Sequence, residues 1–242
     1  MWRMLASILI DIPHFLIHPR RFRWRETLEA LSTLGAGSFQ VITLATAFAG
    51  IVITHEMAWH MQKALHSVAM VPGMSAQFIV RELAVAVPAL LLVSKVGASL
   101  TAEIATMKIT DQIDALRLLG INPLDYLLYP RLIACTVAGG ALTLISILVT
   151  LLCSVATARA YHFSPPEYLA LAGHFMKLTD VIQAVIKGST YGAIIPIMSC
   201  AYGFCCRGGA EGVGHTTTQS VVASTLCVIV LDFILTMLFS LI

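Results

Sequence analysis

The most constraining feature of this chain is a series of apolar runs, each long enough to cross a lipid bilayer. A bilayer core about 30 Å thick needs about 20 apolar residues in an α-helix, and lipid offers no partner to an open backbone group. The runs occur at about 37–55, 83–105, 132–157, 188–206 and 221–242. With 58% hydrophobic and only 12% charged residues, they predict an all-α integral membrane protein with about five transmembrane helices.

Five spans leave no room in 242 residues for a second globular domain. We therefore predict one domain over 1–242. In chain order it comprises N-terminal interfacial helices (1–36), two spans (37–105), a cytosolic helix (106–131), two spans with an outer helix (132–206), and a cytosolic loop with the last span (207–242). The interrupted apolar run 1–17 is too short to span, so we expect it to be retained and to lie at headgroup depth.

Lysine and arginine residues in the connections predict the orientation of the chain. With the N-terminus inside, the cytosolic segments hold nine of these residues, including the cluster in HPRRFRWRE (18–26), and the other side holds five. This bias predicts a cytosolic N-terminus and a C-terminus on the outer side. The segments 106–131 and 207–220 would then be cytosolic.

The connection between the second and third spans is longer than a simple turn requires. Within 101–122, charged and apolar residues alternate at helical spacing, which predicts an amphipathic helix that is either solvated or docked to a partner. The charged set is Glu103, Asp111, Asp114 and Arg117, and the apolar set is Ile104, Met107, Ile113, Leu116 and Leu119. We expect Thr110 to cap a helical turn and Gly120 to end it. On the outer side, SPPEYL predicts a short helix over 165–176 with Ser164 as its N-cap.

Two ionisable residues lie near the centre of predicted spans, where a charge costs a few kcal/mol and usually faces protein or water. Lys95 and Asp232 are each about eleven or twelve residues from one end of their span, which places both near the midplane. We hypothesise that they form an ion pair; alternatively, each faces a wet cavity alone. Arg81 and Glu82 open the second span, and the residues themselves allow either ordinary interfacial charges or a gate.

Several other motifs do not form a metal, nucleotide, disulfide or nucleic-acid site. In HEMAWH, His55 and His60 are five residues apart, so their rings would point about 140° apart on a helix, which excludes a zinc pair. GGAEGVG (208–214) lacks the Lys-Ser/Thr of a phosphate-binding loop, and no Walker A pattern occurs. The six cysteines show no CxxC spacing and are interpreted as core residues. A net charge of +2 without a basic stripe argues against a nucleic-acid partner.

Three blocks of the chain resemble the MlaE-type permeases of ABC transporters associated with MCE proteins. They are the block from RELAVAV to PRLIA (81–134), GGAEGVGHTTTQSVVAS (208–224) and LDFILTMLF (231–239), about a third of the chain. The resemblance implies a homodimer in a bacterial inner membrane, bound to cytosolic ATPases that hold the ATP, so that this chain is not an enzyme and needs no cofactor or metal. It further implies a periplasmic MCE-domain protein and, often, a STAS-domain protein as partners. The cargo would be phospholipid, moved between inner and outer membranes to maintain outer-membrane lipid asymmetry.

The resemblance also implies roles for individual residues. Arg81 and Glu82 would line an outward-facing lipid cavity, and Lys95 and Asp232 would be further substrate-binding or gating positions. ATPase coupling would involve the helix in 106–131 and the residues Glu103, Met107, Asp111, Gln112, Asp114 and Leu116. Family members have Arg in place of Lys95, so we expect only a single point contact from the lysine. Their proline is also placed differently from Pro88, so we expect a local change in the kink of the second span.

Two other functions can be weighed against transport driven by a partner ATPase. A proton-coupled secondary carrier would use Lys95 and Asp232 as a relay and would follow a pH gradient without ATP. An intramembrane hydrolase would need a nucleophile and a base on facing helices. The histidines lie in loops or at the ends of spans, which disfavours the hydrolase.

Overall fold

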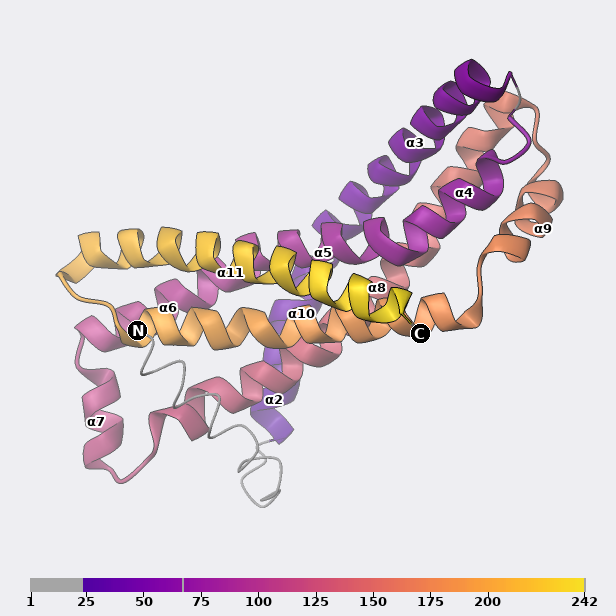
Figure 1. Cartoon of the computed structure of the whole chain (residues 1–242). Helices are drawn as coiled ribbons and strands as arrows, with labels where there is room; N and C mark the ends of the chain where they lie inside the picture. Colours follow the sequence, from indigo (N-terminus) through magenta and orange to yellow (C-terminus); the bar gives the residue numbers. More distant parts are fainter. Residues whose placement is uncertain (1–23, 67, 242) are drawn as a thin grey trace. The chain divides into compact units, whose positions relative to one another are not determined.

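The described part of the chain is helical. The computed structural model describes residues 24–66 and 68–241 (Figure 1), and it has no strand among them. Five helical stretches are long and apolar enough to cross a membrane: Gly37–Ala64, Val71–Ile109, Leu124–Tyr161, Leu178–Phe204 and Gly209–Ser240. The predicted all-α fold with five spans is confirmed, and the predicted interfacial run 1–17 lies outside the described residues.

The helices are arranged along the chain as follows. The first described helix, α2 (Trp24–Ala30), continues through η2 (Leu31–Ala36) into α3 (Gly37–Leu65). The second span consists of α4 (Val71–Phe78), η3 (Ile79–Leu83), α5 (Ala84–Leu92), η4 (Val93–Gly97) and α6 (Ala98–Ile109). After the short α7 (Gln112–Leu118), the third span consists of η5 (Leu124–Leu128), α8 (Tyr129–Ala158) and η6 (Arg159–Tyr161). The remaining helices are α9 (Pro165–Phe175), α10 (Leu178–Phe204) and α11 (Gly209–Ser240).

The helices extend beyond the predicted spans at one or both ends, because hydropathy marks only the part that suits the lipid core while helical hydrogen bonding continues into polar turns. The outer helix follows its prediction closely. Ser164 Oγ accepts from the Glu167 N–H and the Glu167 side chain accepts from the Ser164 N–H, which completes a capping box at the start of α9. This local motif was readable from sequence because all of its parts lie within four residues.

The second span is not a regular α-helix. Its segments η3 and η4 are π-helical, and Pro88 lies inside α5 between them. Proline lacks the N–H that an interior helical position would donate, and π-helical turns frequently occur at functional sites. Arg81 and Glu82 lie in η3 and Lys95 lies in η4.

The contacts divide the chain into two compact units, whereas the sequence predicts a single domain. Unit 1 contains the described residues up to Ser38, Leu90–Gly139 and the chain from Ser189 onward; unit 2 contains Phe39–Ala89 and Gly140–Gly188. The apolar core of unit 1 joins α6 and α7 to η5 and α10, through Ile104, Ile113, Leu127, Leu128, Ile197, Cys200, Ala201 and Phe204. The core of unit 2 contains Ala76, Ala158, Tyr168 and Ala172, where α9 packs on α4.

Glycine allows close helix contacts in each unit. In unit 2, a Cβ on Gly50 of α3 would lie 2.5 Å from the Thr150 carbonyl oxygen of α8. In unit 1, a Cβ on Gly192 of α10 would lie 2.2 Å from the Cys135 carbonyl oxygen of α8. Only glycine therefore permits these two helix pairs to approach so closely.

A chain of buried hydroxyl groups also ties unit 2 together. The Tyr168 hydroxyl of α9 lies 2.9 Å from Ser75 Oγ and 2.6 Å from Ser154 Oγ. Ser154 Oγ lies 2.5 Å from Thr54 Oγ1, so the chain connects α4, α9, α8 and α3. All four side chains are fully buried, and they satisfy one another's hydrogen-bonding capacity.

Candidate functional site

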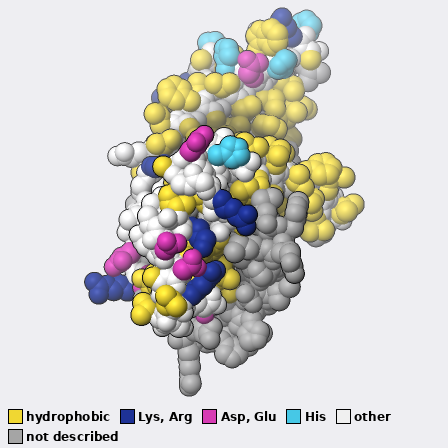
Figure 2. Space-filling model, turned by 90° about the vertical axis from the view of Figure 1, so that its left-hand side faces the viewer, with side chains coloured by type: hydrophobic (Ala, Val, Ile, Leu, Met, Phe, Trp, Pro, Cys, Tyr) yellow, Lys and Arg dark blue, Asp and Glu magenta, His cyan; other side chains and the backbone are white. Residues whose placement is uncertain are grey.

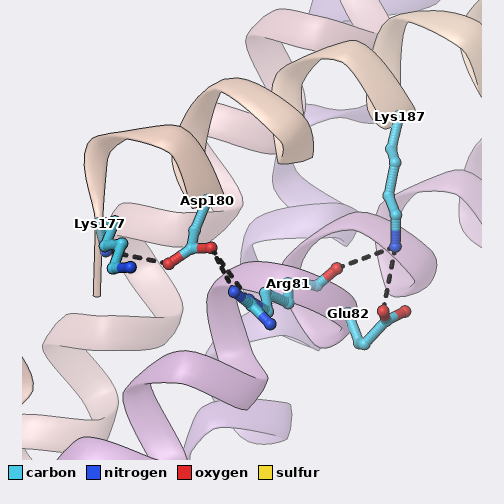
Figure 3. Close-up of polar contacts among 5 residues, drawn as sticks. All are labelled: Arg81, Glu82, Lys177, Asp180 and Lys187. Atoms are coloured by element: carbon cyan, nitrogen blue, oxygen red, sulfur yellow. Dashed lines mark hydrogen bonds and ion pairs between the residues drawn. The ribbon is translucent and has the colours of Figure 1, made fainter. Parts of the chain in front are cut away.

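Arg81 binds a buried carboxylate at the start of α10 (Figure 3). Its Nε and Nη2 donate to Asp180 Oδ1 at 3.0 and 2.8 Å. Asp180 Oδ2 also accepts from the Lys177 N–H at 2.9 Å, so the same side chain caps the first turn of α10. Asp180 is 2% exposed, whereas the Arg81 side chain is 49% exposed. One edge of this ion pair is therefore buried in unit 2, and the guanidinium reaches its surface.

A second ion pair lies beside the first. Lys187 Nζ donates to Glu82 Oε1 at 3.0 Å and to the Arg81 carbonyl oxygen at 3.2 Å. The Lys187 side chain is 3% exposed, and a buried ammonium group of this kind requires such partners. Asp180 and Lys187 are seven residues apart on α10, which places them on the same face of that helix. The four side chains form a balanced network, which we call the η3–α10 network (Arg81, Glu82, Asp180 and Lys187).

The sequence identified half of the η3–α10 network. Adjacent opposite charges at the start of a span marked Arg81 and Glu82. Asp180 and Lys187 were missed because they precede the predicted fourth span, and their pairing with η3 is a contact between residues about a hundred positions apart in the chain. The sequence does offer one signal for them: Asp180 and Lys187 are charged residues seven positions apart in a largely apolar segment.

Lys95 and Asp232 have separate partners in unit 1. Lys95 Nζ donates to the Gly37 carbonyl oxygen. The fully buried Tyr191 of α10 donates its hydroxyl proton to Asp232 Oδ1 at 2.6 Å. Among the described residues the hypothesised ion pair is not formed, because equal depth in the membrane does not fix the direction in which each side chain points around its helix.

The segment after α6 forms an elbow, defined here as residues 106–123. Thr110 does not cap α7 as predicted; its hydroxyl donates to the Thr106 carbonyl oxygen at 2.9 Å. Asp111 occupies the N-cap position instead, in the left-handed region (φ 59°) and without a side-chain capping bond. Gly120 (φ 74°) ends the helix as predicted, with the Ile121 N–H donating to the Leu116 carbonyl oxygen at 3.0 Å.

The elbow is attached to the rest of unit 1 through its apolar side, next to an ion pair at the end of α6. Met107 and Leu116 pack against the core around Ile113, and Glu103 binds Arg131. Glu103, Met107 and Gln112 also line one pocket of about 690 Å³. On the face shown in Figure 2, acidic and basic side chains intermingle with hydrophobic ones around this elbow. Two of the six predicted coupling residues, Met107 and Leu116, thus pack the elbow against the core.

Asp114 is the centre of the charged side of α7. Its carboxylate binds Lys108 Nζ at 3.0 Å and Arg117 Nη1 at 2.9 Å. The hydrogen bond from Lys108, together with the nearby Arg117, holds the pKa of the Asp114 carboxyl below its usual range. These contacts stiffen the elbow on its solvent side.

The tip of the elbow is apolar and exposed. Leu118 is 90% exposed and Leu119 is 74% exposed. Unlike Ile113 and Leu116 of the predicted apolar set, Leu119 is not packed on the core of unit 1. Asp111 and Gln112 are also exposed.

Comparison with known proteins gives a consistent result. The family model described as Permease MlaE matches residues 27–238. A probable ABC transporter permease protein of Synechocystis sp. is 33% identical over 240 residues, which covers 98% of this chain and 90% of the relative. The chloroplast protein Trigalactosyldiacylglycerol 1 of Arabidopsis thaliana is 33% identical over 98% of this chain and 68% of its own length. A probable ABC transporter permease protein of Rickettsia felis is 33% identical over 88% of this chain and 82% of its own length.

The matched region includes the η3–α10 network, Lys95, the elbow and Asp232. It also includes all five candidate spans except the last residues of α11. On both the extent of the family match and the coverage of the relatives, this chain belongs to the MlaE permease family of ABC transporters.

Proposed function

We propose that this chain is the permease subunit of an ATP-driven transporter that moves phospholipids between the inner and outer membranes of a bacterium and so maintains outer-membrane lipid asymmetry. The observation that carries the proposal is the half-exposed guanidinium of Arg81 above a buried carboxylate. A guanidinium forms strong charge-assisted bonds to phosphate oxygens. The Arabidopsis relative is named after a glycolipid, trigalactosyldiacylglycerol, which supports a lipid cargo.

The balance of charge suggests how a lipid would be held and released. The η3–α10 network carries two positive and two negative side chains. A phosphate that binds Arg81 therefore competes with Asp180 for the same donors. Asp180 also caps α10. Lipid binding at Arg81 would thus weaken the attachment of η3 to the start of α10, while the buried pair of Glu82 and Lys187 stays in place.

We further propose that a cytosolic ABC ATPase supplies the energy through the elbow. The helical stretch Val71–Ile109, which carries Arg81, continues at its C-terminal end into the elbow. Contacts to the core give the elbow a stiff base, and its tip offers Leu118 and Leu119, while the exposed Asp111 lies at the other end of α7. Exposed apolar residues on a polar segment mark an interaction site. The tip, rather than the partly buried Met107 and Leu116, would touch the ATPase.

The remaining assembly is part of the same proposal. It includes a homodimer, a periplasmic MCE-domain protein, a STAS-domain protein in some systems, and an inner-membrane location with the N-terminus in the cytosol. α11 supports the homodimer, because few of its residues are buried in its own chain. A second copy would cover part of its apolar surface.

One experiment tests lipid binding and coupling separately. The chain is purified with its partners and reconstituted in proteoliposomes, and transfer of a fluorescent phospholipid is measured with ATP. We expect Arg81→Gln to abolish transfer while the ATPase still co-purifies, and Leu118→Glu with Leu119→Glu to lose the ATPase. Leu169→Glu on α9, another exposed leucine (58%) on the predicted outer side, is the control and should keep the ATPase.

Two outcomes would overturn the proposal. Transfer that follows a pH gradient without ATP, and is lost in Lys95→Gln or Asp232→Asn, would establish the secondary carrier. Full phospholipid transfer by Arg81→Gln would remove the observation on which the lipid site depends.

A further inference from the structure

The end of α3 carries a group of residues that the proposed function does not use. The exposed side chains Leu44, Phe48 and Val52 follow one another at intervals of four residues. His55, Trp59 and Lys63 continue the same face at intervals of three or four residues, and they too are exposed. One face of the helix therefore changes from purely apolar to aromatic and cationic along its length. We call this face the α3 stripe.

The other side of α3 is packed within unit 2. Ile42, Thr46, Thr54 and Ala58 are buried, and Gly50 lies against Thr150 of α8. The direction of the α3 stripe is thus fixed by the packing of the helix. In a membrane-spanning helix, the exposed residues Leu44, Phe48 and Val52 suit contact with acyl chains.

The length of α3 places the polar end of the stripe at headgroup depth. α3 has 29 residues, which at about 1.5 Å per residue gives roughly 44 Å. A hydrocarbon core of about 30 Å accommodates about 20 of them. The apolar run of α3 ends at Thr54, and the ionisable His55 and Glu56 follow it, so Trp59 and Lys63 lie in the polar turns beyond the run.

The geometry of Trp59 and Lys63 suits a phosphate. Lys63 Nζ lies 3.9 Å from the centroid of the Trp59 ring, which holds the ammonium by a cation–π contact. An ammonium group has three donors, and the ring face occupies one side of it. The His60 ring lies edge-on to the Trp59 ring, with 4.9 Å between the ring centroids. His60 Nε2 in turn lies 3.6 Å from Glu56 Oε2.

We propose that Trp59 and Lys63 form a binding site for the phosphate of an anionic phospholipid, in the leaflet at the C-terminal end of α3 and separate from the site at Arg81. The continuous apolar stripe selects a lipid over a soluble partner, because it lies directly below the ammonium group on the same helix face. The site requires only that α3 crosses a membrane, so it goes beyond the proposed transport activity.

Tryptophan fluorescence tests this proposal at a single position. The chain has three tryptophans, Trp2, Trp24 and Trp59. The full-length chain with Trp2→Phe and Trp24→Phe keeps Trp59 as its fluorophore. It is placed in phosphatidylcholine nanodiscs that contain a small share of phosphatidylglycerol or, separately, phosphatidylcholine, each brominated in the acyl chain next to the glycerol backbone, at the depth of Trp59. The ratio of the two quenching constants gives the preference of the site for the anionic lipid.

We expect a preference of about fivefold, which corresponds to the roughly 1 kcal/mol that one lysine contributes near an anionic surface. Lys63→Gln should reduce the preference to about one. Lys177→Gln removes a charge from the same predicted side, away from the stripe, and should leave the preference unchanged. Circular dichroism of each variant confirms that the helices are intact.

The proposal fails if phosphatidylglycerol and phosphatidylcholine quench Trp59 equally, or if the preference survives in Lys63→Gln. It also fails if neither lipid quenches Trp59, since that result would show the stripe to be covered by protein, such as a second copy of this chain. None of these outcomes bears on the ATP-driven transfer that tests Arg81.

Discussion

Replacing Gly192 by alanine should destabilise the protein although alanine is the better helix former. The added Cβ would lie 2.2 Å from the Cys135 carbonyl oxygen, 3.0 Å from its carbonyl carbon and 3.2 Å from Thr136 Cα. All three are backbone atoms of α8, so no side chain can rotate away. α10 and α8 must therefore separate by roughly 1 Å to reach ordinary van der Waals distances.

The two energetic terms of Gly192→Ala have opposite signs. Overpacking of a well-packed core costs about 1–3 kcal/mol, and contact with backbone favours the upper end. Alanine gains about 1 kcal/mol over glycine in a helix interior. The expected net loss of stability is about 2 kcal/mol. Gly214 in α11 is the matched control, because a Cβ there meets no atom within 4 Å and Gly214→Ala should give only the gain of about 1 kcal/mol.

Thermal unfolding of the two variants in the same detergent, followed by circular dichroism, measures the difference. For a chain of this size about 1 kcal/mol corresponds to 2–4 °C. Gly192→Ala should melt below the natural chain and Gly214→Ala at or above it. If Gly192→Ala melts at the temperature of Gly214→Ala or higher, the close approach of α10 and α8 is not a real constraint and the reasoning is refuted.

Two further predictions concern polar contacts. Tyr168→Phe removes the hydroxyl that joins Ser75 and Ser154, which should cost about 1–3 kcal/mol in the same thermal assay; unchanged stability would show that these serines find other partners. The pKa of Asp114 is lower in the folded chain than the unfolded pKa of 3.8, so its bond to Lys108 stabilises the elbow fully above pH 3.8. This stabilisation is lost as the pH falls through the lower folded pKa. Hydrogen exchange of α7 amides should therefore be constant from neutral pH to about pH 4 after correction for intrinsic rates, and protection should fall below it, whereas Asp114→Asn should show no such fall.

Features encoded within a few residues were predictable from sequence. The five spans follow from the length of the apolar runs, and the start of α9 follows from Ser164 and its capping box. Gly120 ends α7 as expected because a left-handed residue there favours glycine. Each of these depends on local geometry that the chain adopts before any distant contact forms.

Features that depend on distant contacts were not predictable. Asp180 and Lys187 bind η3 across about a hundred residues, and no local pattern marks them as partners of Arg81 and Glu82. The error at Thr110 has a different cause. Asp111, with positive φ, is the N-cap of α7 in place of Thr110, and the general preference of threonine for cap positions does not reveal where the chain turns.

The way α11 is held has a consequence for how the sequence can vary. Its buried residues are Ser220, Ser224 and Val228, one every fourth position, and Ser220 accepts a hydrogen bond from Thr101 of α6. The fold of a single subunit therefore constrains only one narrow line of this helix. In a library of all single substitutions, loss of function from substitutions along that line would indicate a loss of folding. Loss of function from substitutions at the other positions of α11 would instead indicate contacts with lipid, cargo or neighbouring subunits. The two sets of positions would distinguish assembly from folding without a structure of the complex.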